Sequence, residues 1–290
     1  MDPKIEQLQL SNGVQMPVLG IGTSHTGGYS DEAVVHALGH CRVRHIDTAR
    51  RYWCEDLVGA SLRKSGVARE QVFITSKLWP SEYGYHETRA AFQDSLQQVG
   101  VEYFDLYLLH WPYSPEGTNT KQLISESWRA LEEFYSQGLC KAIGVSNFQI
   151  SDLKNLEETW NVVPHVNQLE IHIFSYPQKL IEYCRSLGMQ IVAYSPLARG
   201  EALTHPRVME LATRYKRTSS QILNRWILQH GIATIPKSTK CQRVEENSKV
   251  FDFVLTAEDM EALDAIHKTD SHSVFRISSL SLAIFNSRKL

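Results

Sequence analysis

Short apolar runs rich in β-branched residues alternate along the chain with longer amphipathic stretches. The short runs predict strands at residues 18–22, 44–48, 72–76, 106–110, 142–146, 166–170, 190–194 and 233–236. The stretches between them repeat apolar residues at helical spacing and predict helices at residues 30–40, 55–65, 86–99, 121–137, 151–159, 177–187 and 219–230. This pattern is typical of an α/β protein built from repeated strand–helix units.

Both ends of the chain add elements to this alternation. Residues 8–16 predict an N-terminal β-hairpin that caps the bottom of a barrel, because their Asn-Gly pair supplies the positive φ angles of a two-residue turn. Residues 244–249 and 257–267 predict extra C-terminal helices. Residues 271–290 are rich in serine and lose periodicity, so we expect a segment on the surface or at a pocket rim.

Two folds share this local signature. Strands joined by right-handed helical crossovers form either a closed (β/α)8 barrel or an open, doubly wound sheet, and periodicity alone does not choose between them. The length of 290 residues suits a barrel, which needs roughly 250. No linker rich in Pro, Gly or Ser divides the chain, so residues 1–290 are expected to form a single domain.

Composition and charge narrow the possible partners and locations. Apolar residues make up 42% of the chain and charged residues 21%, which is typical of a globular domain. Thirty Lys and Arg stand against 32 Asp and Glu without a long basic block, so no nucleic acid is expected as a partner. No apolar run approaches the roughly 20 residues of a membrane span, and residues 1–7 lack the apolar stretch of a secretory signal. We therefore expect a cytoplasmic protein without a membrane partner.

The cysteine and histidine patterns indicate no metal site. The five cysteines are odd in number and widely spaced, and none forms a Cys-x-x-Cys pair, which indicates reduced thiols. A His-Glu-x-x-His motif is absent as well. A metal-dependent barrel hydrolase needs several His and carboxylate ligands at strand ends, and only His110 and Asp47 meet that requirement.

Four polar residues follow three consecutive predicted strands. Asp47 and Tyr52 come at and after the end of one strand, Lys77 follows the next, and His110 ends the third. In a parallel barrel the carboxyl ends of the strands meet on one face, so these side chains are expected to share a pocket. Taken singly, each has an ordinary explanation: a helix cap, a packed aromatic ring or a surface charge.

Together these four residues suit the reduction of a carbonyl group. Hydride transfer to carbon leaves negative charge on oxygen, so the site must deliver a proton as the hydride arrives. Tyr52 is the expected proton donor, and the neighbouring cation of Lys77 is expected to lower its pKa from about 10. Asp47 would hold Lys77 charged and oriented, and His110 would hydrogen-bond the carbonyl oxygen.

The order and wording of the motifs resemble the aldo-keto reductase family. The motifs are Asp47-x-x-x-x-Tyr52, Ser76-Lys77-Leu78-Trp79, His110-Trp111-Pro112, Gly144-Val145-Ser146-Asn147-Phe148, Val166-Asn167-Gln168-Leu169-Glu170, Tyr194-Ser195-Pro196-Leu197, and Ile235-Pro236-Lys237-Ser238 followed by Arg243 and Glu246-Asn247. The resemblance runs from the hairpin to about residue 253. It implies a (β/α)8 TIM barrel with an N-terminal hairpin and extra C-terminal helices, and NADPH/NADP+ as the cofactor.

Hydride must come from a cofactor, because no protein side chain supplies it, and the chain has no complete Rossmann fingerprint. The resemblance instead implies a cofactor site along the top of the barrel. The implied cofactor-binding residues are Gly22, Thr23, Asp47, Ser146, Asn147, Gln168, Tyr194, Ser195, Pro196, Leu197, Ile235, Lys237, Ser238, Arg243, Glu246 and Asn247. Lys237 and Arg243 suit the 2′-phosphate of NADPH, although the same charges are also common on helix surfaces.

The chain departs from the family pattern around the expected substrate pocket. The candidate substrate-binding residues are Ser24, Arg51, Trp79, His110 and Trp111. Arg50-Arg51 stands before Tyr52 where small or apolar residues are usual, so Arg51 either attracts an anionic substrate or faces solvent with Arg50. Residues 113–121 and 198–205 are short relative to the longer vertebrate members, which would leave the cofactor more open.

The sequence therefore predicts an NADPH-dependent aldehyde or ketone reductase, with a small carbonyl compound as substrate and a monomer or weak homo-oligomer as its state. The alternative is a regulatory or structural barrel protein that binds cofactor with little turnover, since fold alone does not guarantee function. A hydrolase is disfavoured, because Gly144-x-Ser146-x-Phe148 lacks the second glycine of a nucleophile elbow.

Overall fold

The computed structural model describes residues 6–24 and 27–274. Eight parallel strands lie in one sheet in the order β10-β9-β8-β7-β6-β5-β4-β3. They are β3 Ile21–Gly22, β4 His45–Asp47, β5 Phe73–Leu78, β6 Phe104–Leu109, β7 Cys140–Ser146, β8 Val166–Glu170, β9 Gln190–Tyr194 and β10 Ala233–Thr234. A parallel bridge between Leu19 and Thr234 joins the two edge strands, and the Thr234 amide donates to the Val18 carbonyl at 2.7 Å. This closure confirms the (β/α)8 barrel over the open sheet.

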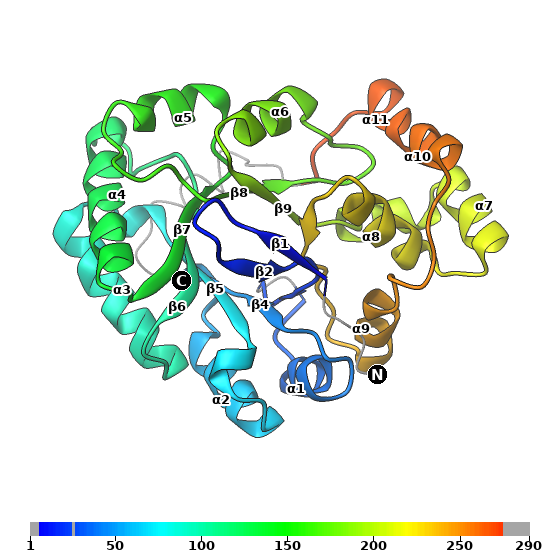
Figure 1. Ribbon diagram of the computed structural model, residues 1–290, viewed down its shortest axis with the longest axis horizontal. Helices are drawn as coiled ribbons and strands as arrows, with labels where there is room; N and C mark the ends of the chain where they lie inside the picture. The colour runs from blue at the N-terminus through cyan, green and yellow to red at the C-terminus, as the bar shows by residue number, and fades with distance from the viewer. Residues whose placement is uncertain (1–5, 25–26, 275–290) are drawn as a thin grey trace.

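Eight helices surround the strands (Figure 1). They are α1 Asp31–Gly39, α2 Glu55–Ser65, α3 Tyr85–Val99, α4 Thr120–Ser136, α5 Ile150–Glu157, α6 Gln178–Ser186, α8 Ser219–Gln229 and α9 Cys241–Ser248. The extra C-terminal helices are confirmed as α10 Ala257–Asp264 and α11 Ile266–Thr269. Short 3-10 segments precede or follow several strands: η1 Arg50–Tyr52, η2 Arg69–Gln71, η3 Pro80–Glu82 and η4 Ala198–Thr204.

Local chemistry explains where these helices begin. The Ser30 side chain accepts from the Ala33 amide at the start of α1. At α8 the Thr218 side chain accepts from the Gln221 amide while the Gln221 side chain accepts from the Thr218 amide, which is a capping box. Each cap satisfies amide donors that the first helical turn leaves without intrahelical partners.

One helix has no counterpart in the sequence expectations. Helix α7 spans Pro206–Tyr215, between β9 and α8, where no element was predicted. Proline at its first turn suits a helix start, and Val208 and Leu211 are buried on one face. Val208, Leu211 and Ala212 recur at helical spacing, so the sequence contains a periodic signal for this helix that the expectation of one helix per strand leaves out.

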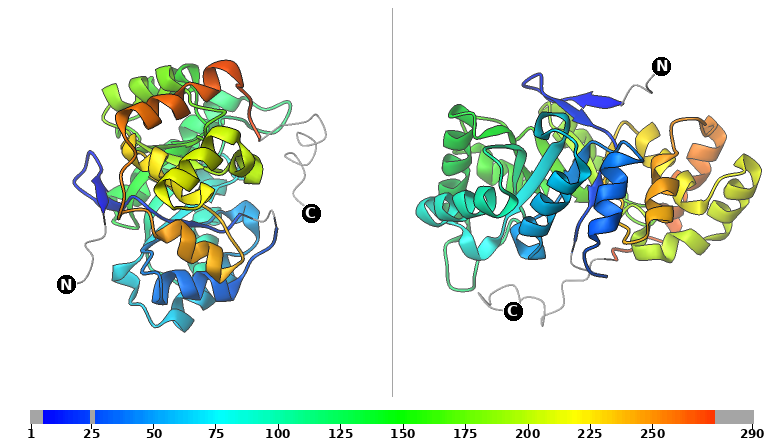
Figure 2. Two further views of the ribbon diagram at one scale, coloured as in Figure 1. Left: turned by 90° about the vertical axis from the view of Figure 1, so that its right-hand side faces the viewer. Right: turned by 90° about the horizontal axis from the view of Figure 1, so that it is seen from below.

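The hairpin of β1 Gln7–Gln9 and β2 Gln15–Pro17 lies across the amino-terminal end of the barrel, as Figure 2 shows. Leu10 and Met16 pack there against barrel residues that include Phe73, which confirms the cap. The expected two-residue turn is wrong. The Leu10 amide donates to the Val14 carbonyl at 2.8 Å across a three-residue loop in which only Gly13 has a positive φ, +87°.

The core has two parts, one inside the barrel and one between strands and helices. Small and branched side chains such as Ala142, Val166 and Val192 fill the inside. Larger rings such as Phe92 and Trp128 fill the outer layer. Close packing of the interior fixes the strand ends relative to one another, which matters for the side chains that follow them.

The beginning of the C-terminal segment contacts the carboxyl end of the barrel. The Ser273 hydroxyl donates to Glu170 at 2.5 Å, and the His272 ring stacks on Phe174 with centroids 4.5 Å apart. Residues 271–274 thus lie at the rim, as expected, and residues 275–290 are outside the described part of the chain. Across the described ranges, no helix is both long and apolar enough to cross a bilayer.

Candidate active site

The four predicted catalytic residues meet at the carboxyl end of the barrel. Asp47 is the last residue of β4, Lys77 is the next-to-last of β5, and His110 directly follows β6. Tyr52 ends the 3-10 segment η1, which follows β4. Parallel pairing of β4 with β5 and of β5 with β6 sets the three strand ends side by side.

Lys77 and Asp47 form a buried ion pair at the centre of this group. The Lys77 Nζ lies 2.5 Å from Asp47 Oδ1 and donates to the Thr48 carbonyl at 2.8 Å, and the side chain is 0% exposed. The other Asp47 oxygen accepts from Gln168 Nε2 at 2.8 Å. Burial lowers the pKa of Lys77, and the Asp47 carboxylate opposes that shift. The pair is therefore held by a complete set of partners rather than by charge alone.

The acidity of Tyr52 differs from the expectation. The Lys77 Nζ lies 5.1 Å from the centre of the Tyr52 ring, so the two residues are neighbours. Burial raises the pKa of Tyr52 well above 10, and the charge of Asp47 raises it further. The net shift is thus opposite to the predicted lowering, because burial of the ring and the nearby Asp47 carboxylate both favour the neutral phenol. Tyr52 is thus held in its protonated form.

Aromatic rings form one wall beside the ion pair. The His110 ring meets Tyr52 edge-on at 5.7 Å between centroids and Trp79 edge-on at 5.2 Å. The Arg51 guanidinium carbon lies 5.4 Å from the centre of the Trp79 ring. His110 is therefore fixed between rings, close to the Tyr52 side chain.

The two neighbouring arginines have different surroundings. Arg50 is held by Glu82 at 2.8 Å and Asp94 at 2.8 Å, and these partners raise its pKa against the effect of burial. Arg51 lines the cavity above Tyr52. The alternative in which both arginines face solvent is therefore wrong.

These side chains open into a cavity of about 890 Å³. The predicted residues that line it are Gly22, Ser24, Asp47, Arg51, Tyr52, Trp79, His110, Trp111, Ser146, Asn147, Gln168, Tyr194, Ser195, Pro196, Leu197, Ile235, Lys237, Ser238, Arg243, Glu246 and Asn247. Thr23 does not line it. The residue is buried below the cavity surface, and its hydroxyl donates to the Asp47 carbonyl at 3.0 Å. Lys77 lies behind Asp47, away from the cavity surface.

Polar side chains on β7, β8 and β9 form a connected group in this cavity. Tyr194 donates to Asn147 Oδ1 at 2.8 Å, and Asn147 Nδ2 donates to the His110 carbonyl at 3.0 Å. The Ser146 hydroxyl donates to the Gln168 carbonyl at 2.9 Å. Asn147 has a φ of +66°, a left-handed conformation that its turn at the end of β7 requires. The group is preorganised before any ligand binds.

Sequence reasoning missed several lining residues. They are Gly27, Arg199, Gly200, Leu203, Thr218, Ser219, Ser220 and Thr239. The capping box that starts at Thr218 was a readable signal, since it marks the amino end of α8, whose first residues Ser219 and Ser220 line the cavity. Arg199 gave no such signal, because η4 sits in a kinked segment where Ala198, Arg199 and Gly200 all have positive φ.

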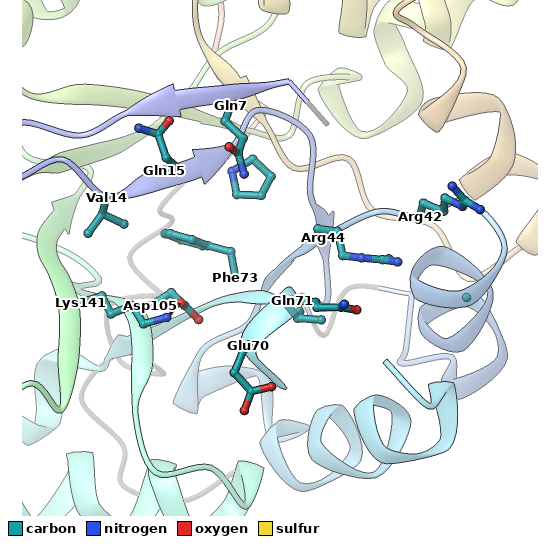
Figure 3. A pocket seen from close by; sticks show the side chains of 13 residues that line it. Gln7, Val14, Gln15, Arg42, Arg44, Glu70, Gln71, Phe73, Asp105 and Lys141 are labelled. Atoms are coloured by element: carbon teal, nitrogen blue, oxygen red, sulfur yellow. Dashed lines mark ion pairs between the residues drawn. The ribbon is translucent and has the colours of Figure 1, made fainter. Parts of the chain in front are cut away.

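A second cavity, of about 870 Å³, lies at the opposite end of the barrel (Figure 3). It is lined by the hairpin and by charged residues that include Arg44, Asp105 and Lys141. Asp105 is bridged by Lys141 at 3.0 Å and by Arg69 at 2.7 Å, and Arg44 donates to the Leu38 carbonyl at 2.6 Å. These charges are engaged in holding loops together.

Comparison of the sequence with known proteins identifies its family. A model of the aldo/keto reductase family matches residues 18–268. The chain belongs to the aldo/keto reductase family.

Relatives and solved structures share most of the chain. The glyoxal reductase of Bacillus subtilis is 42% identical over 267 residues, which cover 91% of this chain and 94% of that protein. A Bombyx mori aldo-keto reductase solved with NADP is 30% identical, with a TM-score of 0.85 over 95% of this chain and 96% of that one. An aldo/keto reductase from Brucella melitensis is 36% identical, with a TM-score of 0.84 over 91% of this chain and 100% of that one.

Proposed function

We propose that this protein reduces aldehydes or ketones to alcohols with NADPH, with Tyr52 as the proton donor. The observation that carries the proposal is the buried Asp47–Lys77 pair, 2.5 Å between charged atoms, beside Tyr52 and His110 at the floor of the large cavity. NADPH would supply the hydride and leave as NADP+.

The residues around the cavity fit this cofactor. Lys237 and Arg243 provide two cations at one end, where a 2′-phosphate would be held. The amides of Asn147 and Gln168 and the ring of Tyr194 lie near His110 and Asp47, where the nicotinamide carboxamide and ring would be held. The amino end of α8, where the helix dipole is positive, suits the intervening phosphates.

The residues at the floor of the cavity support proton delivery. Tyr52 stays protonated because burial and Asp47 raise its pKa, so it is ready to give a proton to a developing alkoxide, whose basicity draws that proton away. Lys77 then stabilises the charge left on the phenol oxygen. His110, held between Tyr52 and Trp79, orients the carbonyl oxygen.

The entrance supports a substrate with both apolar and anionic parts. Trp79 and Trp111 line the cavity with apolar surface, and Arg51 lines it beside Trp79. The guanidinium group of Arg51 can bind a carboxylate or phosphate through two parallel hydrogen bonds. We therefore infer a preference for aldehydes or ketones that carry a carboxylate or phosphate group.

The experiment is the oxidation of NADPH with a panel of neutral and acidic aldehydes, for the natural chain and for Tyr52→Phe. Removal of one hydroxyl preserves the ring that packs on His110, so the variant should fold and bind NADPH. Its turnover should fall by roughly 10²–10⁴-fold. In the natural chain, a Tyr52 pKa raised above 10 predicts that ionisation of Tyr52 causes no loss of reduction between neutral pH and pH 10.

Two results would contradict the proposal. Equal turnover in Tyr52→Phe would assign the proton to another group. Tight NADPH binding with no turnover of any aldehyde or ketone would favour the regulatory barrel protein instead.

A further inference from the structure

A cluster of metal-ligating side chains lies on the outer surface of the barrel, away from the cavity. His36 and His40 are on and directly after α1, and Glu245 is on α9. One ligand atom of each lies within 4.8 Å of the others. From this cluster we infer a binding site for a divalent transition-metal ion, with Zn²⁺ as the best-suited ion.

The two histidines are spaced as a helical metal chelate. Residues four apart project from the same face of a helix, and the His36 and His40 rings stack with centroids 4.6 Å apart at 22°. His36 Nε2 is buried and has no hydrogen-bond partner within the described part of the chain. A buried ring nitrogen without a partner is costly, and a metal ion would satisfy it.

The third ligand comes from a distant segment. Glu245 contributes a carboxylate, so that two imidazoles and one carboxylate face one point, which is a common donor set for Zn²⁺ with water in the fourth position. Zinc–ligand distances are about 2.0–2.2 Å, so ligand atoms that now lie within 4.8 Å of one another would draw closer together around the bound ion. Lys249 Nζ pairs with Glu245 Oε1 at 2.6 Å and is the group the ion would displace.

The position of the cluster gives the ion a structural consequence. Helices α1 and α9 follow β3 and β10, the two short strands whose pairing closes the barrel, and they lie side by side (Figures 1 and 2). An ion shared by His36, His40 and Glu245 ties the first strand–helix unit to the last. It closes a loop on the order of 200 residues, and such long loops gain most from a crosslink in chain-entropy models.

The test is thermal unfolding of the whole chain, free of NADPH, with and without Zn²⁺ and then with EDTA. One Zn²⁺ per chain should bind, and at about 100 times its dissociation constant it should raise Tm by roughly 4–8 °C, a gain that EDTA reverses. His40→Ala, at an exposed position, and His36→Ala should each lose the shift. An unchanged shift in both variants would overturn the inference.

Two matched controls separate the site from general effects. Lys249→Gln breaks the same ion pair as Glu245→Gln but leaves every ligand, so Lys249→Gln should keep the zinc shift and Glu245→Gln should lose it. His86→Ala removes an exposed histidine of α3 and should keep it. Equal responses of the two ion-pair variants would overturn the role of Glu245.

The ion should also tighten NADPH binding a few-fold. Arg243 is two residues from Glu245, so it points to a different side of α9 and lines the cavity. This effect on NADPH binding rests on the proposed function. The thermal test uses no NADPH, so it tests the zinc site independently of the proposed function. Unchanged NADPH affinity in the presence of Zn²⁺ would overturn the coupling through α9.

Discussion

The two ends of the barrel contain cavities of nearly equal volume, about 890 Å³ at the carboxyl end and about 870 Å³ at the amino end. Their charged residues differ in burial. At the carboxyl end both Lys77 and Asp47 are buried, at 0% and 3% exposed, whereas at the amino end Asp105 is 6% exposed but its partners Arg69 and Lys141 are 15% and 43% exposed. Cavity size therefore does not identify which end holds the candidate active site, whereas the burial of both partners of the Lys77–Asp47 ion pair does.

The backbone differs between the ends as well. Loops at the carboxyl end include Asn147, Ser195, Ala198 and Arg199 with positive φ. A conformation of this kind costs free energy in a residue other than glycine, and it persists where the surroundings demand it. The amino end is closed by a regular hairpin whose single positive φ in the turn falls on Gly13. Arg42, which lines the amino-end cavity, has a φ of +56° as well, so strain of this kind occurs at both ends and is more frequent at the carboxyl end.

The largest expected difference comes from removing one lysine at each end. Lys77→Met leaves the Asp47 carboxylate buried with Gln168 as its remaining side-chain donor, so it should reduce turnover by at least roughly 100-fold and destabilise the fold by about 3–5 kcal/mol. Lys141→Met leaves Asp105 bridged by Arg69, so it should cost less than about 1 kcal/mol and leave turnover unchanged. Enzyme assays and urea unfolding measure both effects.

A double substitution separates the two roles of Lys77. Asp47→Asn combined with Lys77→Met removes both charges, which should recover most of the lost stability without recovering turnover. Recovered turnover in this variant would show that the pair is structural and that the comparison of the two ends fails.

A smaller effect is expected from the cations at the far side of the site cavity. Lys237→Met with Arg243→Met should raise the KM for NADPH by roughly 10–100-fold while the KM for NADH changes little, because each lost charged hydrogen bond is worth about 1.5–3 kcal/mol before screening by solvent. Steady-state kinetics with both cofactors is the measurement. Arg44→Met at the amino end is the control and should change neither KM. An equal rise for NADPH and NADH would argue against a 2′-phosphate contact.

Much of the site could be predicted because its residues follow readable strands. Asp47, Lys77 and His110 each close an apolar run, and barrel geometry brings such ends together without further information. The different surroundings of Arg50 and Arg51 could not be predicted from the sequence. Arg50 forms ion pairs with Glu82 and Asp94, and both acids lie far from it along the chain.

Other features depended on contacts that leave no local signal. The raised pKa of Tyr52 follows from burial and from the charge of Asp47, and neither effect can be read from a sequence pattern. The approach of His36 and His40 to Glu245 depends on the closure of the barrel, which brings α1 beside α9. Helix α7 was missed although its apolar residues recur at helical spacing, because it adds a second helix between β9 and β10, outside the regular alternation of one strand with one helix.

The smallest expected effect tests the charge of Arg51 in the site cavity. Arg51 lies against Trp79 and is partly exposed, so solvent weakens its attraction for an anion. Arg51→Val should therefore lower kcat/KM for acidic aldehydes by roughly tenfold and leave neutral aldehydes within about twofold. Arg42→Val, at the amino-end cavity, is the matched loss of one arginine and should change neither. The ratio of the two specificity constants at low and high salt is the measurement. A ratio that Arg51→Val leaves unchanged would remove Arg51 from substrate selection and leave the tryptophans as the wall that selects the substrate.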